Sequence, residues 1–178
     1  VIASLDELAR VRAEPRQPTH FLWLDAGDEL DQDALYELAS TLNGDPLLDL
    51  IYFDHEVVDD DDRRSPAHKP AWSPDYLECF DYIGSSACFR WERAVEILPN
   101  AASRYDLILR LTDSPRAIEN IDRVLLRRGA SPGAGSTTEG AAGDIRALEG
   151  RLARTGRNGV VRVNVAGTAT YRSDIALR

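Results

Sequence analysis

The apolar residues of the chain fall into short runs that predict strands alternating with helices. Two runs, "HFLWL" at 20–24 and "LLDLIYFD" at 47–54, are apolar on both faces, as expected of strands covered by helices. Between them, 31–45 has the spacing of an amphipathic helix. Its predicted buried face consists of Leu35, Leu38, Ala39 and Leu42. The order strand, helix, strand indicates a βαβ unit and a layered α/β sheet.

The same pattern continues along the rest of the chain. Ser73 before Pro74 is a typical helix start, with an N-cap hydroxyl and a proline at the first helical position. A capping box, Ser4 with Glu7, predicts another start. The predicted helices are 4–12, 73–80, 92–98, 104–113 and 144–156; the predicted strands are 20–24, 47–54, 85–91, one bent strand or two short ones within 116–128, and a terminal hairpin or extended tail over 160–175. In the helix at 104–113, the candidate core residues are Tyr105, Leu107, Ile108 and Leu111.

Composition changes at residue 129 and divides the chain into three parts. Residues 129–143 are rich in Gly, Ser and Ala and have too little apolar surface to fold alone. The sequence therefore predicts an α/β domain at 1–128, a linker or loop at 129–143, and an appendage at 144–178 made of a helix and connector strands.

Charge and cysteine content exclude some functions. The net charge is −9 with a pI of about 4.8, and no basic stripe is present, so nucleic acid is not an expected partner. No run approaches the roughly 20 apolar residues that span a bilayer. Cys79 and Cys88 lie in different predicted elements and are expected to be buried free thiols. The acids of 59–62 read as a solvated loop tip.

Both apolar runs end in acids, which draws attention to two corners. Asp25 and Asp28 flank Gly27 after the first run, and Asp54, His55 and Glu56 end the second. The residues alone leave open whether the first corner is a metal site at the end of a buried strand or only a polar turn. His55 is more typical of a surface or internally hydrogen-bonded histidine than of a ligand.

Several stretches taken together resemble family 2 glycosyltransferases, inverting enzymes of the GT-A fold. The stretches occur in one order: "FLWLDAGDELDQDALYEL", "DLIYFDHEVVD", "HKPAWSPDYL", "DYIGSSACFRWE", "YDLILRL" and "VLLRRGASPGAGST". They are most similar to the bacterial group that builds O-antigen, rhamnan and other surface polysaccharides. The resemblance covers 20–178, and the end of the chain looks like the connector between two such domains.

The resemblance implies a fold, partners and a location. The expected fold is a partial GT-A mixed sheet flanked by helices, because only about 20 residues precede the first corner and most of the nucleotide-binding half has no counterpart here. The chain is thus expected to be a fragment or a naturally truncated domain. Implied partners are a nucleotide-sugar, a glycan acceptor and other domains of a larger glycosyltransferase; the implied location is cytoplasmic, including the inner face of the cytoplasmic membrane.

The family's chemical positions are altered in this sequence. Where the family corner reads Asp-x-Asp-Asp, Asp25 matches the first acid, Gly27 replaces the metal-binding acid, and Asp28 would ligate only if the turn shifted. Arg104 occupies the place of the general base and cannot abstract a proton. Asp106 matches a following acid that fits helix capping better than catalysis. Arg127 stands where a histidine is usual and would hold a phosphate.

Other matching positions suggest a substrate cleft. The resemblance places Asp54, His55 and Glu56 toward the donor or acceptor. It also brings Trp72, Asp81 and Gly84 to the acceptor side, where Trp72 either stacks on a sugar or anchors its loop in the core.

Two functions therefore remain open from the sequence. The first is inverting transfer of a sugar from a nucleotide-sugar to a glycan, with Mg²⁺ or Mn²⁺ as cofactor if the site is active. The alternative is a catalytically decayed GT-A module that binds glycan or scaffolds an active domain, with no metal because of Gly27. An unrelated phosphatase or hydrolase is disfavoured, since no nucleophile motif is present.

Overall fold

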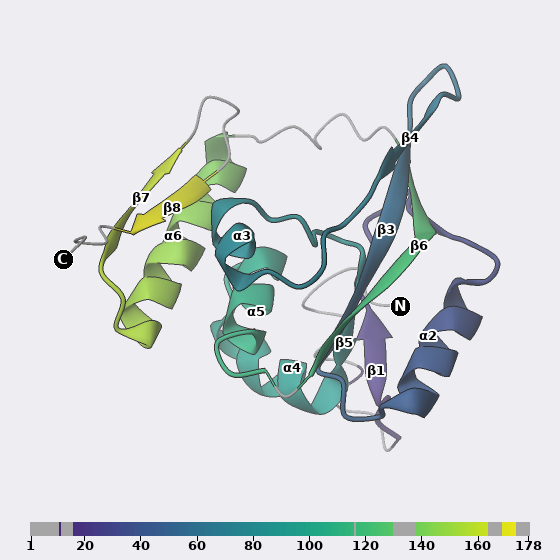
Figure 1. Cartoon of the computed structure of the whole chain (residues 1–178), viewed down its shortest axis with the longest axis horizontal. Helices are drawn as coiled ribbons and strands as arrows, with labels where there is room; N and C mark the ends of the chain where they lie inside the picture. The colour runs from purple at the N-terminus through teal and green to yellow at the C-terminus, as the bar shows by residue number, and fades with distance from the viewer. Residues whose placement is uncertain (1–10, 12–15, 116, 130–137, 164–168, 174–178) are drawn as a thin grey trace.

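A curled, mixed six-stranded sheet forms the centre of the computed structural model, which describes residues 11, 16–115, 117–129, 138–163 and 169–173 (Figure 1). Its strands are arranged in the order β1 (His20–Leu22), β5 (Ala87–Arg90), β3 (Leu50–Val58), β6 (Ile118–Gly129) and β2 (Glu29–Leu30). Strand β4 (Arg64–Ala67) pairs with the far half of β3. Strands β3 and β6 are parallel, and the other neighbours are antiparallel. The predicted α/β class is confirmed, although β5 separates the two strands that the sequence places in one βαβ unit.

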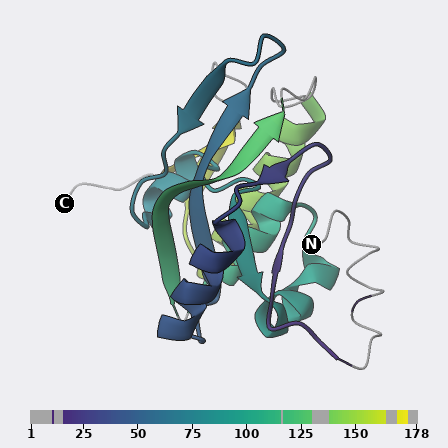
Figure 2. The same ribbon diagram turned by 90° about the vertical axis from the view of Figure 1, so that its right-hand side faces the viewer.

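Helices cover both faces of this sheet. Helix α2 (Ala34–Gly44) lies on one face, in front of the sheet in Figure 2, and α3 (Pro74–Cys79), α4 (Trp91–Ile97) and α5 (Arg104–Leu111) lie on the other. A short 3₁₀ turn, η1 (Leu98–Asn100), joins α4 to the loop before α5. Alternate residues of β3 face opposite layers, as the strand pleat requires. Leu50 and Tyr52 join the cluster under α5, and Ile51 and Phe53 join the cluster under α2.

Helix α2 buries a narrower face than predicted. Ala34 and Leu38 are buried and Leu42 is partly buried, whereas Leu35 is 64% exposed and Ala39 is exposed. The prediction for Leu35 and Ala39 was wrong. Positions 34, 38 and 42 form a single stripe four residues apart, and this stripe alone meets the sheet.

Helix α5, the start of α3 and strand β6 agree more closely with the predictions from the sequence. Its predicted core residues are all buried: Tyr105, Leu107, Ile108 and Leu111. Ser73 caps α3 by accepting a hydrogen bond from the backbone N–H of Tyr76, as its position before Pro74 predicts. Strand β6 is one long strand with a register irregularity, which matches the expectation of a bent strand.

The irregularity in β6 lies opposite Asp54. Phe53 pairs with Ile121 and Asp54 pairs with Val124, so Asp122 and Arg123 are extra residues in the ladder. A bulge of this kind bends the strand and turns its side chains in new directions. The bulge therefore places Asp122 beside the end of the buried half of β3.

The C-terminal helix packs against α5, and the C-terminal hairpin packs against that helix. Helix α6 (Thr138–Thr155) begins inside the segment expected to be a linker, and β7 (Gly159–Val163) pairs with β8 (Ala169–Ser173) in the predicted antiparallel hairpin. Neither cysteine forms a disulfide, as predicted, but Cys79 is exposed and only Cys88 is buried. Except for Val11, which is helical, the helix predicted at 4–12 lies outside the described residues. Among the described residues, no helix is long and apolar enough to cross a membrane.

Candidate functional site

The acidic corner, residues 25–28, is a tight turn between β1 and β2. The N–H of Asp28 donates to the carbonyl of Asp25 (3.1 Å), and the Asp28 carboxylate accepts from the N–H of Asp25 (3.1 Å). Gly27 has a φ of +88°, a conformation that side-chain-bearing residues rarely adopt. A Cβ at Gly27 would meet no atom within 4 Å, so the requirement for glycine is one of backbone conformation rather than space.

Arg104, in the first turn of α5, contacts this corner. Its two terminal nitrogens donate to the two oxygens of Asp25, at 2.9 and 3.1 Å, and its guanidinium lies 5.8 Å from the centre of the Trp23 ring. Burial opposes ionisation of Asp25, but the hydrogen bonds and charge of Arg104 outweigh it and hold the pKa of Asp25 below its usual value. Arg104 and Asp25, the first acid of the corner, therefore neutralise each other's charge.

A second arginine, Arg128, also faces the corner. Its guanidinium lies 3.7 Å from Asp25 and 3.8 Å from Asp28. Arg127, the residue selected from the sequence, instead pairs with Glu56 (3.0 Å) and Glu29 (3.2 Å). Neighbouring residues of a strand point to opposite faces, so the alternation of β6 was the signal that separates these two arginines.

These contacts do not suit a divalent cation at the corner. Both oxygens of Asp25 accept from Arg104, one oxygen of Asp28 accepts from the backbone, and Gly27 offers no side chain. A cation placed there would also face two guanidinium groups. Burial raises the pKa of Asp28, so the corner does not favour an added charge on this carboxyl.

The second predicted cluster does not form one site, and it lies in the middle of β3 because the strand continues past Asp54 to Val58. Asp54 is buried and accepts from the Nδ1 of His68 (2.6 Å) and from the N–H of Lys69 (2.7 Å). His55 is also buried, with its Nδ1 3.0 Å from the hydroxyl of Ser86. Glu56 pairs with Arg127 and Arg64 instead. Each of the three predicted residues thus has a different set of partners.

The remaining predicted cleft residues hold the loop between β4 and β5. The carboxylate of Asp81 accepts from the N–H of Gly84 (3.0 Å), and Gly84 has a φ of +59°. Trp72 is partly buried and packs against the main core, which favours its anchoring role. Lys69 donates through Nζ to the carbonyl of Tyr82, and burial lowers the pKa of Lys69 to about 8.

Asp106 has a local structural role. It is buried, and its two oxygens accept from the N–H of Ala102 and from the Nε of Arg110, each at 3.0 Å. Ser103 caps the same helix by accepting from the N–H of Asp106 (3.1 Å). Asp106 therefore holds the start of α5 and thereby the position of Arg104.

Replacing His55 by glutamine is expected to change how stability depends on pH. Burial, with the charges of Lys69 and Arg128, lowers the pKa of His55 to about 4. The unfolded chain then binds a proton that the folded chain does not, so His55 costs stability as the pH falls from about 6.5 to 4. As the pH falls over this range, the free energy of unfolding of the variant should therefore rise relative to that of wild type. The slope should stay below the one-proton limit of about 1.4 kcal/mol per pH unit.

Urea titrations of both proteins at several pH values measure this difference, and taking the difference removes the opposing contribution of Asp144. Burial, with the charge of Asp81, raises the pKa of Asp144 to about 6, so that carboxyl favours folding at low pH and loses its effect as the pH rises. A difference that stays constant from pH 4 to 7 would contradict the buried, neutral state of His55.

Comparison with known proteins gives one informative match. No protein-family model matches the chain. The chain is similar to the O-antigen biosynthesis protein RfbC of Myxococcus xanthus, with 36% identity over 151 residues. The match covers 78% of this chain but 12% of that protein, so the chain spans about an eighth of the length of its relative.

Proposed function

We propose that the chain is a GT-A-type glycosyltransferase-like module of a larger protein in surface polysaccharide biosynthesis, and that its own corner does not carry out metal-dependent sugar transfer. The observation that carries this proposal is the bidentate hydrogen bonding of Arg104 to Asp25. It occupies both oxygens of the first corner acid with the residue that stands in the place of the base.

The biosynthetic setting rests on similarity. The relative is named for O-antigen biosynthesis, and it is many times longer than the part that matches. The order of the motifs resembles the family 2 glycosyltransferases, and the mixed sheet covered by helices on both faces is compatible with that fold. Both observations support a module that works beside other parts of one protein, on the cytoplasmic side where nucleotide-sugars are used.

The non-catalytic role rests on chemistry. Inverting transfer needs a group that removes a proton from the acceptor hydroxyl, and a guanidinium stays protonated at any working pH. It also needs a positive charge beside the leaving diphosphate to neutralise it. The family 2 glycosyltransferases obtain this charge from a metal ion held by an acid, and Gly27 stands at the position of that acid. The proposed role is therefore to bind glycan or to scaffold an active domain of the same protein.

Calorimetry with Mn²⁺ and a panel of UDP-, GDP- and dTDP-sugars tests the absence of donor binding. We expect no binding of any of these sugars tighter than about 1 mM, a free energy of about −4 kcal/mol. Binding of one of them at micromolar concentration, with release of free nucleoside diphosphate in the presence of an acceptor, would establish the transferase function instead.

Substitutions in the full-length protein test the scaffold role in cells. Asp25→Asn removes the charge of the first corner acid and should leave the amount of surface polysaccharide unchanged. Leu107→Asp places a charge in the buried core of the module and should abolish the polysaccharide, because the module no longer folds. Loss of polysaccharide with Asp25→Asn, in a protein that is still folded, would point to chemistry at the corner.

A further inference from the structure

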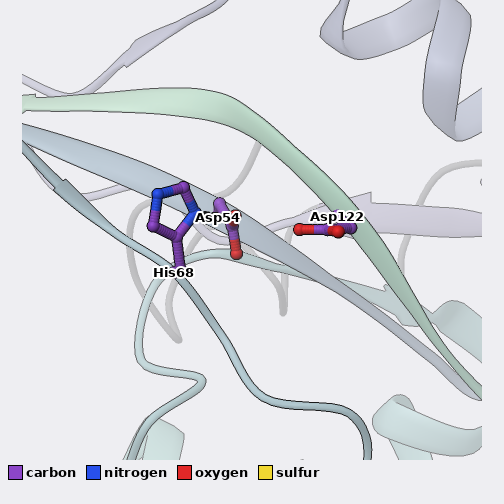
Figure 3. Close-up of side chains that lie close together, drawn as sticks. All are labelled: Asp54, His68 and Asp122. Atoms are coloured by element: carbon purple, nitrogen blue, oxygen red, sulfur yellow. Dashed lines mark hydrogen bonds and ion pairs between the residues drawn. The ribbon is translucent and has the colours of Figure 1, made fainter.

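We infer that Asp54, His68 and Asp122 form a binding site for a transition-metal divalent cation, separate from the acidic corner. One ligand atom from each of the three side chains lies within 4.8 Å of the other two (Figure 3). They come from three parts of the fold: strand β3, the segment after β4, and the bulge in β6. The inference does not depend on the proposed function.

The fold fixes the first ligand firmly. Asp54 is 1% exposed, and one of its oxygens is held by the N–H of Lys69 at 2.7 Å. The other oxygen is directed at the Nδ1 of His68, 2.6 Å away. The His68 side chain is 69% exposed and can adjust to an incoming ion. One rigid carboxylate and one adjustable imidazole suit a site that forms around a cation.

The bulge in β6 supplies the second carboxylate. Asp122 is one of the two extra residues between the pairs Phe53–Ile121 and Asp54–Val124. In a regular ladder the side chains of β6 would alternate between the two faces of the sheet without these two unpaired residues. The bulge brings the exposed carboxylate of Asp122 beside a buried one, an arrangement that costs energy unless positive charge lies between them.

The basic side chains of β6 are all directed elsewhere. Arg123 pairs with Asp33 and Glu37 on the side of α2. Arg127 and Arg128 pair with the acids described above. In the described part of the chain, no arginine forms an ion pair with Asp54 or Asp122, and Lys69 donates to a carbonyl instead. Among the described residues, the side chain that forms an ion pair with Asp54 is the imidazole of His68, and the charge of Lys69 acts on Asp54 without an ion-pair contact. A divalent cation would balance the charge of the two carboxylates.

The ligand types indicate which cation. An imidazole nitrogen with carboxylate oxygens suits Zn²⁺ or Mn²⁺ better than Mg²⁺ or Ca²⁺, which prefer oxygen ligands alone. Two ligands on one zinc ion are separated by about 3.3 Å, given bonds of about 2.0 Å in a tetrahedral site. Binding would replace the 2.6 Å hydrogen bond by two metal bonds, with the imidazole proton on Nε2 and the ring moved slightly outward. The ion would then tie the segment after β4 to β6.

Titration of the purified chain with ZnCl₂ and with MnCl₂, followed by calorimetry, tests the site. We expect one ion per chain, and at least tenfold weaker binding for His68→Ala and for Asp122→Asn. Asp60→Asn removes the same charge from the exposed loop after β3 and should bind as wild type does. Asp28→Asn, which alters the acidic corner, should also have no effect.

Each other outcome overturns the inference. Absence of binding to wild type, or wild-type affinity in His68→Ala, would show that these side chains do not hold an ion. Loss of binding in Asp28→Asn alone would place the ion at the corner. His68 and Asp122 are both exposed, so these variants should fold, and a thermal melt without metal checks that they do.

Discussion

Replacing Arg151 by methionine is expected to lower the free energy of unfolding by about 3 kcal/mol. Arg151 lies on α6 and is 5% exposed. It donates to Glu78 on α3 (2.7 Å) and, at the end of α5, to the carbonyl of Leu109 (2.7 Å), to Thr112 (3.1 Å) and to Asp113 (3.0 Å). The substitution would leave Glu78, which is 1% exposed, with one cationic partner fewer inside the core.

The expected loss lies at the lower end of the range for breaking a buried ion pair. Arg157 also donates to Glu78, at 2.6 Å, and remains in the variant. Methionine keeps the length and apolar stem of the side chain, so the measurement reports the lost hydrogen bonds and charge rather than a cavity.

Arg154→Met is the matched control for this prediction. Arg154 lies on the same helix and pairs with Asp113 (2.6 Å), but it is 28% exposed, so its loss should cost less than about 1 kcal/mol. Urea denaturation of the three proteins measures both effects. Equal small losses would show that the contacts of Arg151 do not attach α6, and that α6 is held by apolar packing alone.

The local elements of this fold could be predicted because their causes are local. Ser73 and Pro74 specify the start of α3 through an N-cap and a fixed φ, and both lie within one turn of the helix they begin. The apolar spacing of α5 gave its core residues correctly, because this helix is buried on most sides. Helix α2 meets the sheet along one stripe only, and there the same reasoning included Leu35 and Ala39 wrongly.

The arrangement of the sheet depends on contacts distant in sequence and was not predictable in this way. Strand β5 pairs with both β1 and β3, and it comes after both of them in the chain. Arg151 likewise reads as an ordinary charged residue on an amphipathic helix, whereas it is buried against α3 and α5. Its partner Glu78 lies 73 residues away, beyond the reach of any periodicity argument.

The candidate site was partly predictable. The sequence identified Gly27 and Arg104 as departures from the family pattern, but their relation to each other required the structure. Residue 104 contacts the corner acid directly, so one arginine removes the base and also occupies Asp25. His68 and Asp122 were missed. His68 begins the resembling stretch "HKPAWSPDYL" but was given no role there, Asp122 lies outside the resembling stretches, and their proximity depends on the bulge in β6.

Restoring both acids of the family pattern, Gly27→Asp together with Arg104→Asp, is expected to increase Mn²⁺ affinity at the corner at least tenfold over wild type. Gly27→Asp alone adds a carboxylate while Arg104 still holds Asp25. Arg104→Asp alone frees Asp25 but leaves the corner without the central ligand. Because the two changes act on one site, their effects should be more than additive.

The backbone should tolerate the first substitution. A Cβ at Gly27 meets no neighbouring atom, so the cost is that of a positive φ, about 1 kcal/mol for a residue such as aspartate that accepts this region better than most. An aspartate at 104 lies in the first turn of α5, where a negative charge favours the helix. Arg128 remains within 3.8 Å of the corner and limits the gain.

The neutral pair Gly27→Asn with Arg104→Asn is the control, since it has the same backbone change and the same loss of the arginine without new charge. All proteins should also have His68→Ala, so that the site inferred at Asp54 does not contribute to the measured Mn²⁺ binding. A tenfold gain in the aspartate pair but not in the asparagine pair would show that carboxylates at these two positions are what the corner lacks. An equal gain in both pairs would assign the effect to Arg104 alone, because releasing Asp25 would then be sufficient. No gain in either pair would mean that the contact between Arg104 and Asp25 is not what keeps a cation out.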